Sequence, residues 1–231
     1  MSPRSSADGW IARLLTEPIV FDTMIVRHLC NAGAGGALAT AFAGRMLWPS
    51  AVDAELNLQA GYVRPLASFM ASKPGRKIDI DAAEDDEVEE IRIDMYTKKV
   101  ARASDTEHLG EAQCLFLAER DGYPIATNDG RARARARANW DDTKNAPRMA
   151  GGKKVEVFHT VDVLQAMVRL GVCKPGPAWD FYDTACARGL TDLPGYERPG
   201  SRGRFLTDAS TMRAMRLADL AARTGAPSKG P

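Results

Sequence analysis

The chain has 231 residues, 45% of them hydrophobic, and a formal net charge of +1. This length suits one α/β domain with extensions, and the apolar fraction is enough to build a core. Because the net charge is close to zero, the overall charge does not predict a strongly charged partner. The acidic and basic residues are nevertheless segregated along the chain. Residues 79–94 hold nine acids against one base, and residues 131–154 hold eight bases against two acids, a separation that matters for a polyanionic partner.

The sequence predicts neither membrane insertion nor secretion. No apolar run approaches the ~20 residues of a membrane span, and Arg13 interrupts the apolar N-terminal residues that would form a signal-peptide core. The four cysteines have no metal-binding or redox spacing, so we expect free thiols in a reducing cytoplasm.

Apolar periodicity predicts strands that alternate with helices along the chain. Residues 73–83 are expected to be a polar connection, and Ser50 with Asp53 is expected to form a capping box at a helix start. Alternation of this kind predicts a small, mostly parallel sheet covered by helices on both faces. The expected strands are 18–22, 45–48, 124–127 and 155–158, and the expected helices are 23–31, 36–43, 50–60, 62–72, 84–102, 107–121, 130–138 and 160–170.

The composition changes after residue 173. Lys174-Pro175-Gly176-Pro177 is expected to be a hinge, followed by helices at 178–188 and 208–223. These helices carry apolar side chains that are costly to leave in water, so we expect them to pack on their own domain, on a second copy or on a partner protein. Those side chains are Trp179, Tyr182, Met212 and Met215. The expected organisation is an N-terminal extension at 1–17, an α/β domain at 18–173 and a helical C-terminal arm at 174–231.

Four acidic residues are the candidate site. Asp22 ends the first expected strand and Asp129 follows another, whereas Glu55 and Glu111 stand early in helices. The carboxyl ends of parallel strands meet in one crevice, so these acids are expected to converge. At an effective dielectric near 20, two like charges ~4 Å apart repel by about 4 kcal/mol. A fold keeps such a cluster only if a cation neutralises it, and oxygen ligands favour Mg²⁺ or Mn²⁺, the ions that assist phosphodiester hydrolysis.

The simpler alternative is that each acid stabilises a helix N-terminus or is merely solvated. The chain has 30 acids, so no one of them by itself predicts a site. The order of the four acidic motifs along the chain favours the functional interpretation.

These motifs resemble those of the PIN-domain nucleases, and the Gly-Glu-Ala form is similar to the branch that includes VapC-like toxins. The residues that carry the resemblance are Phe21-Asp22-Thr23, Trp48–Leu56 around Glu55, His108–Ala112 around Glu111, and Ile125–Asp129. The resemblance covers about residues 18–171. It implies a PIN-like three-layer sandwich whose catalytic and metal-binding residues are Asp22, Glu55, Glu111 and Asp129, with Thr23 and Asn128 lining the site.

The resemblance also implies a Mg²⁺- or Mn²⁺-dependent endoribonuclease, with the toxin of a toxin–antitoxin pair as the preferred role. The expected partners are an RNA substrate, an antitoxin protein and a second copy in a homodimer. Two alternatives stay open: a catalytically silent PIN-like module that binds RNA or protein, and a housekeeping RNA-processing nuclease.

Basic residues beside Asp129 are candidates for contact with the RNA backbone. Arg131 and Arg135 share one face of the expected helix, and Lys153 and Lys154 follow in the sequence. A solvated helix face is an equally good interpretation. The acids at 84–90 are expected to form a solvated face, and His108 is expected to cap or pack rather than to bind metal.

Overall fold

The computed structural model describes residues 13–97, 108–141, 155–188 and 201–224. Its centre is a five-stranded sheet in which every neighbouring pair of strands is parallel. The strand order is β3-β2-β1-β4-β5. The expectation of a mostly parallel sheet is confirmed. The strands are β1 (Ile19–Phe21), β2 (Met46–Pro49), β3 (Gly75–Ile78), β4 (Ile125–Ala126) and β5 (Val157–Phe158).

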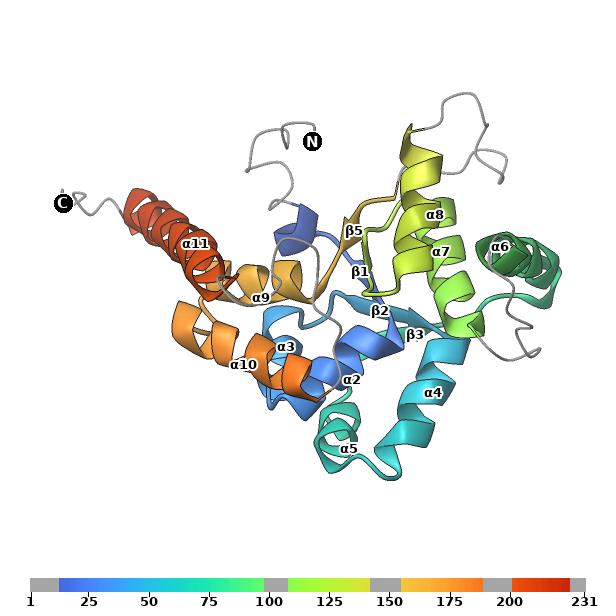
Figure 1. Ribbon diagram of the computed structural model, residues 1–231, viewed down its shortest axis with the longest axis horizontal. Coiled ribbons are helices and arrows are strands. Elements are labelled where there is room, and N and C mark those ends of the chain that lie inside the picture. Colours follow the sequence, from blue (N-terminus) through green and yellow to red (C-terminus); the bar gives the residue numbers. More distant parts are fainter. Residues whose placement is uncertain (1–12, 98–107, 142–154, 189–200, 225–231) are drawn as a thin grey trace.

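Helices cover both faces of this sheet and make three layers. Figure 1 shows α6, α7 and α8 gathered on one side of the sheet, with α2, α3, α9 and α10 on the other. The helices are α2 (Thr23–Asn31), α3 (Gly35–Ala41), α4 (Ser50–Ala60), α5 (Arg64–Ala71), α6 (Asp85–Thr97, after the short 3-10 helix Ala82–Glu84), α7 (Leu109–Asp121), α8 (Gly130–Asp141), α9 (Thr160–Arg169), α10 (Pro175–Ala187) and α11 (Ser201–Thr224).

The chain reverses its direction of travel across the sheet between β1 and β4. It runs from β1 outward through β2 to β3, then returns to the other side of β1 for β4 and β5. In open parallel sheets, ligands bind outside the carboxyl ends of the strands at such a reversal. Asp22 directly follows β1, and Asp129 lies three residues beyond β4, so both aspartates stand at this point of the fold.

Burial explains why β1 forms the centre of the sheet. Ile19, Val20 and Phe21 are fully buried, as expected of a parallel strand that is covered on both faces. The helix α7 packs against β1, β2 and β4, and its buried side chains run along most of its length. Cys30 and Cys114 lie in this core, and all four cysteines are free thiols.

The edge strand β3 was missed by the sequence prediction, which placed a polar connection at 73–83. Its sequence, Gly-Arg-Lys-Ile, has one apolar side chain, and Arg76 and Lys77 are exposed. An edge strand needs little apolar character, and charged side chains on it discourage pairing with other chains. Gly75 is required here, because a Cβ atom would lie 2.4 Å from the Trp48 ring.

The C-terminal arm packs on its own domain, which was the first of the three expected arrangements. The helices α10 and α11 both contact α9, and α10 also contacts α2. Trp179, Tyr182 and Phe205 are buried together, with ring centroids of Trp179 and Phe205 5.6 Å apart. The side chain of Met212 is half-buried, and the side chain of Met215 is not among those described.

The expected hinge at 174–177 is wrong. Pro175 opens α10, a favourable place for proline because the first helical N–H has no intrahelical partner. The helix α11 begins at Ser201 rather than at 208. Within the described ranges, no helix is long and apolar enough to cross a membrane.

Candidate active site

Asp22 is buried at the end of β1, with 1% of its surface exposed. It is the N-cap of α2, where its Oδ1 accepts a 3.5 Å hydrogen bond from the Met24 N–H. The Thr127 hydroxyl, just after β4, donates to Asp22 Oδ2 at 2.9 Å and accepts from the Asp129 N–H at 3.0 Å. Thr127 therefore joins the two aspartates across the β1–β4 boundary.

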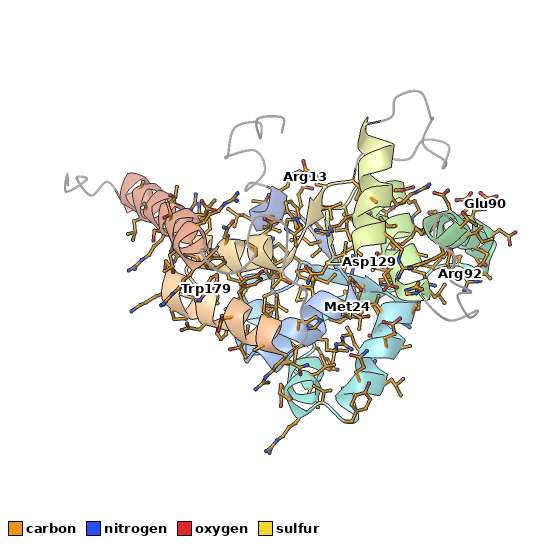
Figure 2. All side chains as sticks on the ribbon, viewed as in Figure 1. Arg13, Met24, Glu90, Arg92, Asp129 and Trp179 are labelled. Atoms are coloured by element: carbon orange, nitrogen blue, oxygen red, sulfur yellow. The ribbon has the colours of Figure 1, made fainter. Side chains whose placement is uncertain are left out.

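Asp129 also has a capping role. Its Oδ1 accepts hydrogen bonds from the N–H groups of Arg131 and Ala132 at 2.8 and 2.7 Å. These bonds satisfy two backbone donors at the start of α8. They use one carboxylate oxygen and fix the orientation of the other. In Figure 2 the labelled Asp129 lies in the middle of the molecule, whereas Glu90 of α6 points outward.

Glu55 reaches the same region from α4. The Thr23 hydroxyl, in the first residue of α2, donates to Glu55 Oε2 at 2.5 Å. Gly110, in the first turn of α7, lies against the other oxygen: a Cβ atom on Gly110 would stand 2.9 Å from Glu55 Oε1. The absence of a side chain at 110 therefore leaves room for the Glu55 carboxylate beside α7.

Gln113 sets the position of α4 relative to α7. Its buried Oε1 accepts a 3.0 Å hydrogen bond from the Ala51 N–H. The predicted capping box of Ser50 and Asp53 is wrong, because Pro49 is the N-cap and Asp53 instead accepts a bond from Trp48 Nε1 at 2.9 Å. A side chain from α7 thus supplies a cap for α4, and it brings Glu55 beside the start of α7.

Glu111 stands in the first turn of α7, with its Oε1 3.8 Å from His108 Nδ1. Burial, and then the charge of Glu111, raise the pKa of Asp22 to about 8, and Glu55 adds to this increase. Burial likewise raises the pKa of Glu111, with further contributions from Glu55 and Asp129. Each of the four predicted acids therefore influences, or is influenced by, the charge of at least one other, and Asp129 is linked in this way to Glu111.

In the described part of the chain, no three side chains of His, Cys, Asp or Glu form a group that could hold a metal ion by themselves. Mg²⁺ does not require such a group, because it keeps several water molecules and is commonly bound by one or two carboxylates. The donors gathered here are carboxylate and hydroxyl oxygens, which suit Mg²⁺ or Mn²⁺ better than softer metals.

Thr23 occupies the position expected of a site residue, but Asn128 does not. The Asn128 amide binds Thr160 at both ends: Nδ2 donates to the Thr160 hydroxyl at 2.7 Å, and Oδ1 accepts from the Thr160 N–H at 3.1 Å. Asn128 therefore links the end of β4 to the start of α9, and neither contact supports the prediction that it lines the acidic site.

The four basic residues predicted to contact RNA also have different outcomes. Arg135 is buried and pairs with Asp94 at 2.7 Å and with Glu119 at 3.5 Å, so the prediction that it contacts RNA from an exposed face is wrong. Arg131 is half-buried, with its guanidinium over the Tyr96 ring. Lys153 and Lys154 lie outside the described residues.

Two side chains that position the candidate acids were missed by the sequence analysis: Thr127 and Gln113. Thr127 carried a signal, because it is a polar residue that immediately follows a buried strand. Gln113 carried no signal, since it contacts the start of α4 only because α7 docks there. The exposed acids of α6, Asp85, Asp86, Glu87 and Glu90, form the solvated face that was expected.

Searches of protein-family models, of curated proteins and of solved structures found no match to this chain. The likeness to PIN domains accordingly rests on the acidic motifs themselves.

Replacement of Gly110 by alanine is expected to impair the site with little loss of stability. The new Cβ would displace the Glu55 carboxylate, the movable end of a flexible side chain, while alanine gains up to about 1 kcal/mol over glycine inside a helix. We expect a melting temperature close to that of the wild type and at least a ~10-fold weaker Mn²⁺ affinity. Unchanged Mn²⁺ affinity, measured by calorimetry, would remove Glu55 from the metal site.

Proposed function

We propose that this chain is a Mg²⁺- or Mn²⁺-dependent endoribonuclease of the PIN type, with Asp22, Glu55, Glu111 and Asp129 as its metal-binding and catalytic acids. One observation carries the proposal. Four carboxylates from four separate elements are linked to one another by their charges beside the strand-order reversal of a parallel sheet, where α/β folds bind ligands.

The electrostatics support a cation at this position. Without one, burial and mutual repulsion raise the pKa of both Asp22 and Glu111, so the ionised cluster is destabilised. A nearby positive charge favours the ionised form of a carboxyl group. The four acids would hold the ion between β1, α4, α7 and α8. When bound, such an ion polarises a phosphoryl oxygen and lowers the pKa of water.

The chain's own residues prepare this site in two ways. The hydroxyls of Thr127 and Thr23 donate to Asp22 and Glu55 and so fix the orientation of these carboxylates before any ligand arrives. Burial of Asp22 excludes bulk water from the carboxylate, which strengthens its interaction with a cation or with developing charge.

The proposed biological role rests on the motifs alone. The resemblance to VapC-like proteins supports a toxin that is controlled by an antitoxin protein, acting on RNA in the cytoplasm. A second candidate, a PIN-like module that binds RNA without cleaving it, is favoured by one observation: the described side chains form no group of three that could hold a metal by themselves.

The test is to incubate the purified full chain with a labelled single-stranded RNA, and with DNA of the same sequence, in Mg²⁺, Mn²⁺ or EDTA. We expect cleavage of RNA with either ion and none with EDTA. RNA binding without cleavage under every metal condition would favour the silent module. Cleavage that persists in EDTA would exclude the metal-dependent mechanism.

A further inference from the structure

Tyr96 of α6 stands between the two helix starts that present Glu111 and Asp129. Its ring stacks on the His108 ring with centroids 4.2 Å apart, and the Arg131 guanidinium lies 4.3 Å from its centroid. His108 is the N-cap of α7, three residues before Glu111, and Arg131 is two residues after Asp129. The stack therefore ties α6 to the positions from which both acids project.

His108 adopts a conformation that supports this arrangement. Its φ of 63° is in the left-handed region, which is uncommon for residues other than glycine, although histidine adopts it more often than most. Such local strain persists where surrounding contacts fix it, and it recurs at functional sites. Here the stacking partner is Tyr96, and the histidine Nδ1 faces the Glu111 carboxylate at 3.8 Å.

The Tyr96 hydroxyl is buried and has no hydrogen-bond partner among the residues that the structure describes. A buried donor without an acceptor is unfavourable, so each such case calls for an explanation. Burial raises the pKa of this phenol, and Glu111 and then Asp129 raise it further. The hydroxyl therefore keeps its proton at neutral pH, and the charges of both carboxylates act on it.

We propose that Tyr96 is a positioning residue of the acidic site, and that its hydroxyl donates a hydrogen bond to the Glu111 carboxylate when the site holds its cation. The inference rests on the proposed function, since it assigns the metal-bound state. Outer donors of this kind orient the ligands of a metal, and their loss typically weakens metal affinity or activity by 10–100-fold.

The test uses Tyr96→Phe, which removes the hydroxyl and keeps the ring that stacks on His108 and Arg131. We expect the dissociation constant for Mn²⁺, measured by calorimetry on the full chain, to rise at least ~10-fold. The melting temperature in EDTA should not fall, because the lost hydroxyl has no hydrogen-bond partner among the described residues. Tyr62→Phe, at a ring that is 72% exposed, is the matched control and should change neither quantity.

Two results would overturn the inference. Equal Mn²⁺ affinity of wild type and Tyr96→Phe would remove the hydroxyl from the metal site. A clearly lower melting temperature of Tyr96→Phe in EDTA would show that the hydroxyl already has a partner without metal.

The wild-type protein and Asp22→Asn are measured beside Tyr96→Phe, so that failure of this inference can be told from failure of the proposed function. This inference alone fails if the wild type and Tyr96→Phe bind Mn²⁺ equally well while Asp22→Asn does not bind it. If the wild type binds no Mn²⁺, the metal-dependent function fails with it.

Discussion

Replacement of Asp22 by asparagine is expected to abolish RNA cleavage while the protein stays folded. Asparagine keeps a carbonyl oxygen that can accept the hydrogen bond from Thr127, so the local geometry is retained. It removes the charge of the most buried of the four acids. We expect the cleavage rate in Mg²⁺ to fall by a factor on the order of 10² or more, as when one preorganised electrostatic contact is lost. Undiminished cleavage by a preparation free of contaminating nuclease would refute the assignment.

The same substitution is expected to stabilise the metal-free protein, and more so as the pH rises. The pKa of Asp22 is higher in the folded chain than its usual value of 3.8. The folded state therefore binds the extra proton, and this stabilisation is complete below about pH 4 and lost as the pH rises through about 8. Asparagine does not titrate, so its advantage over aspartate should grow by up to about 1.4 kcal/mol per pH unit across that window.

Denaturant unfolding in EDTA at pH 5 and pH 8 measures this effect. Glu90→Gln is the matched control, since it also changes an acid to its amide but at an exposed position on α6. Its effect on stability should be small at both pH values. If Asp22→Asn is less stable than wild type at pH 8 without metal, the carboxylates are not crowded in the way that the structure indicates.

Phe205→Ala is expected to cause the largest loss of stability in the C-terminal arm. Phe205 is fully buried against Trp179 and Tyr182, which belong to α10. Truncation of a buried phenylalanine to alanine typically costs about 3–5 kcal/mol. For a chain of this size that corresponds to a fall in melting temperature of roughly 6–20 °C, and we also expect lower solubility as the apolar surface of α9 and α10 becomes exposed.

Leu217→Ala serves as the control on the same helix, because the Leu217 side chain is 55% exposed. It should leave the melting temperature nearly unchanged. Equal melting temperatures for Phe205→Ala and Leu217→Ala would mean that α11 does not dock on α10 in solution. The arm would then be dispensable to the fold, and a chain ending at Val172 should be as stable as the full protein.

The sequence by itself determined the elements whose signals are local. The apolar run at 18–22 and the polar residues after it predicted β1 and the start of α2, because a buried parallel strand is apolar throughout and a capping aspartate ends it. The order of the four acids predicted that they would meet, because strand ends and helix starts gather at one edge of a parallel sheet.

Only the tertiary structure decided what depends on how separate elements dock. β3 forms because β2 offers it a partner, although its own sequence carries little strand signal. Arg135 faces inward because Asp94 and Glu119 lie on helices packed against α8. Tyr96 contacts His108 and Arg131 because α6 lies beside the starts of α7 and α8. Periodicity within one segment records which residues share a face, but the partner of that face is set by contacts between residues far apart in the chain.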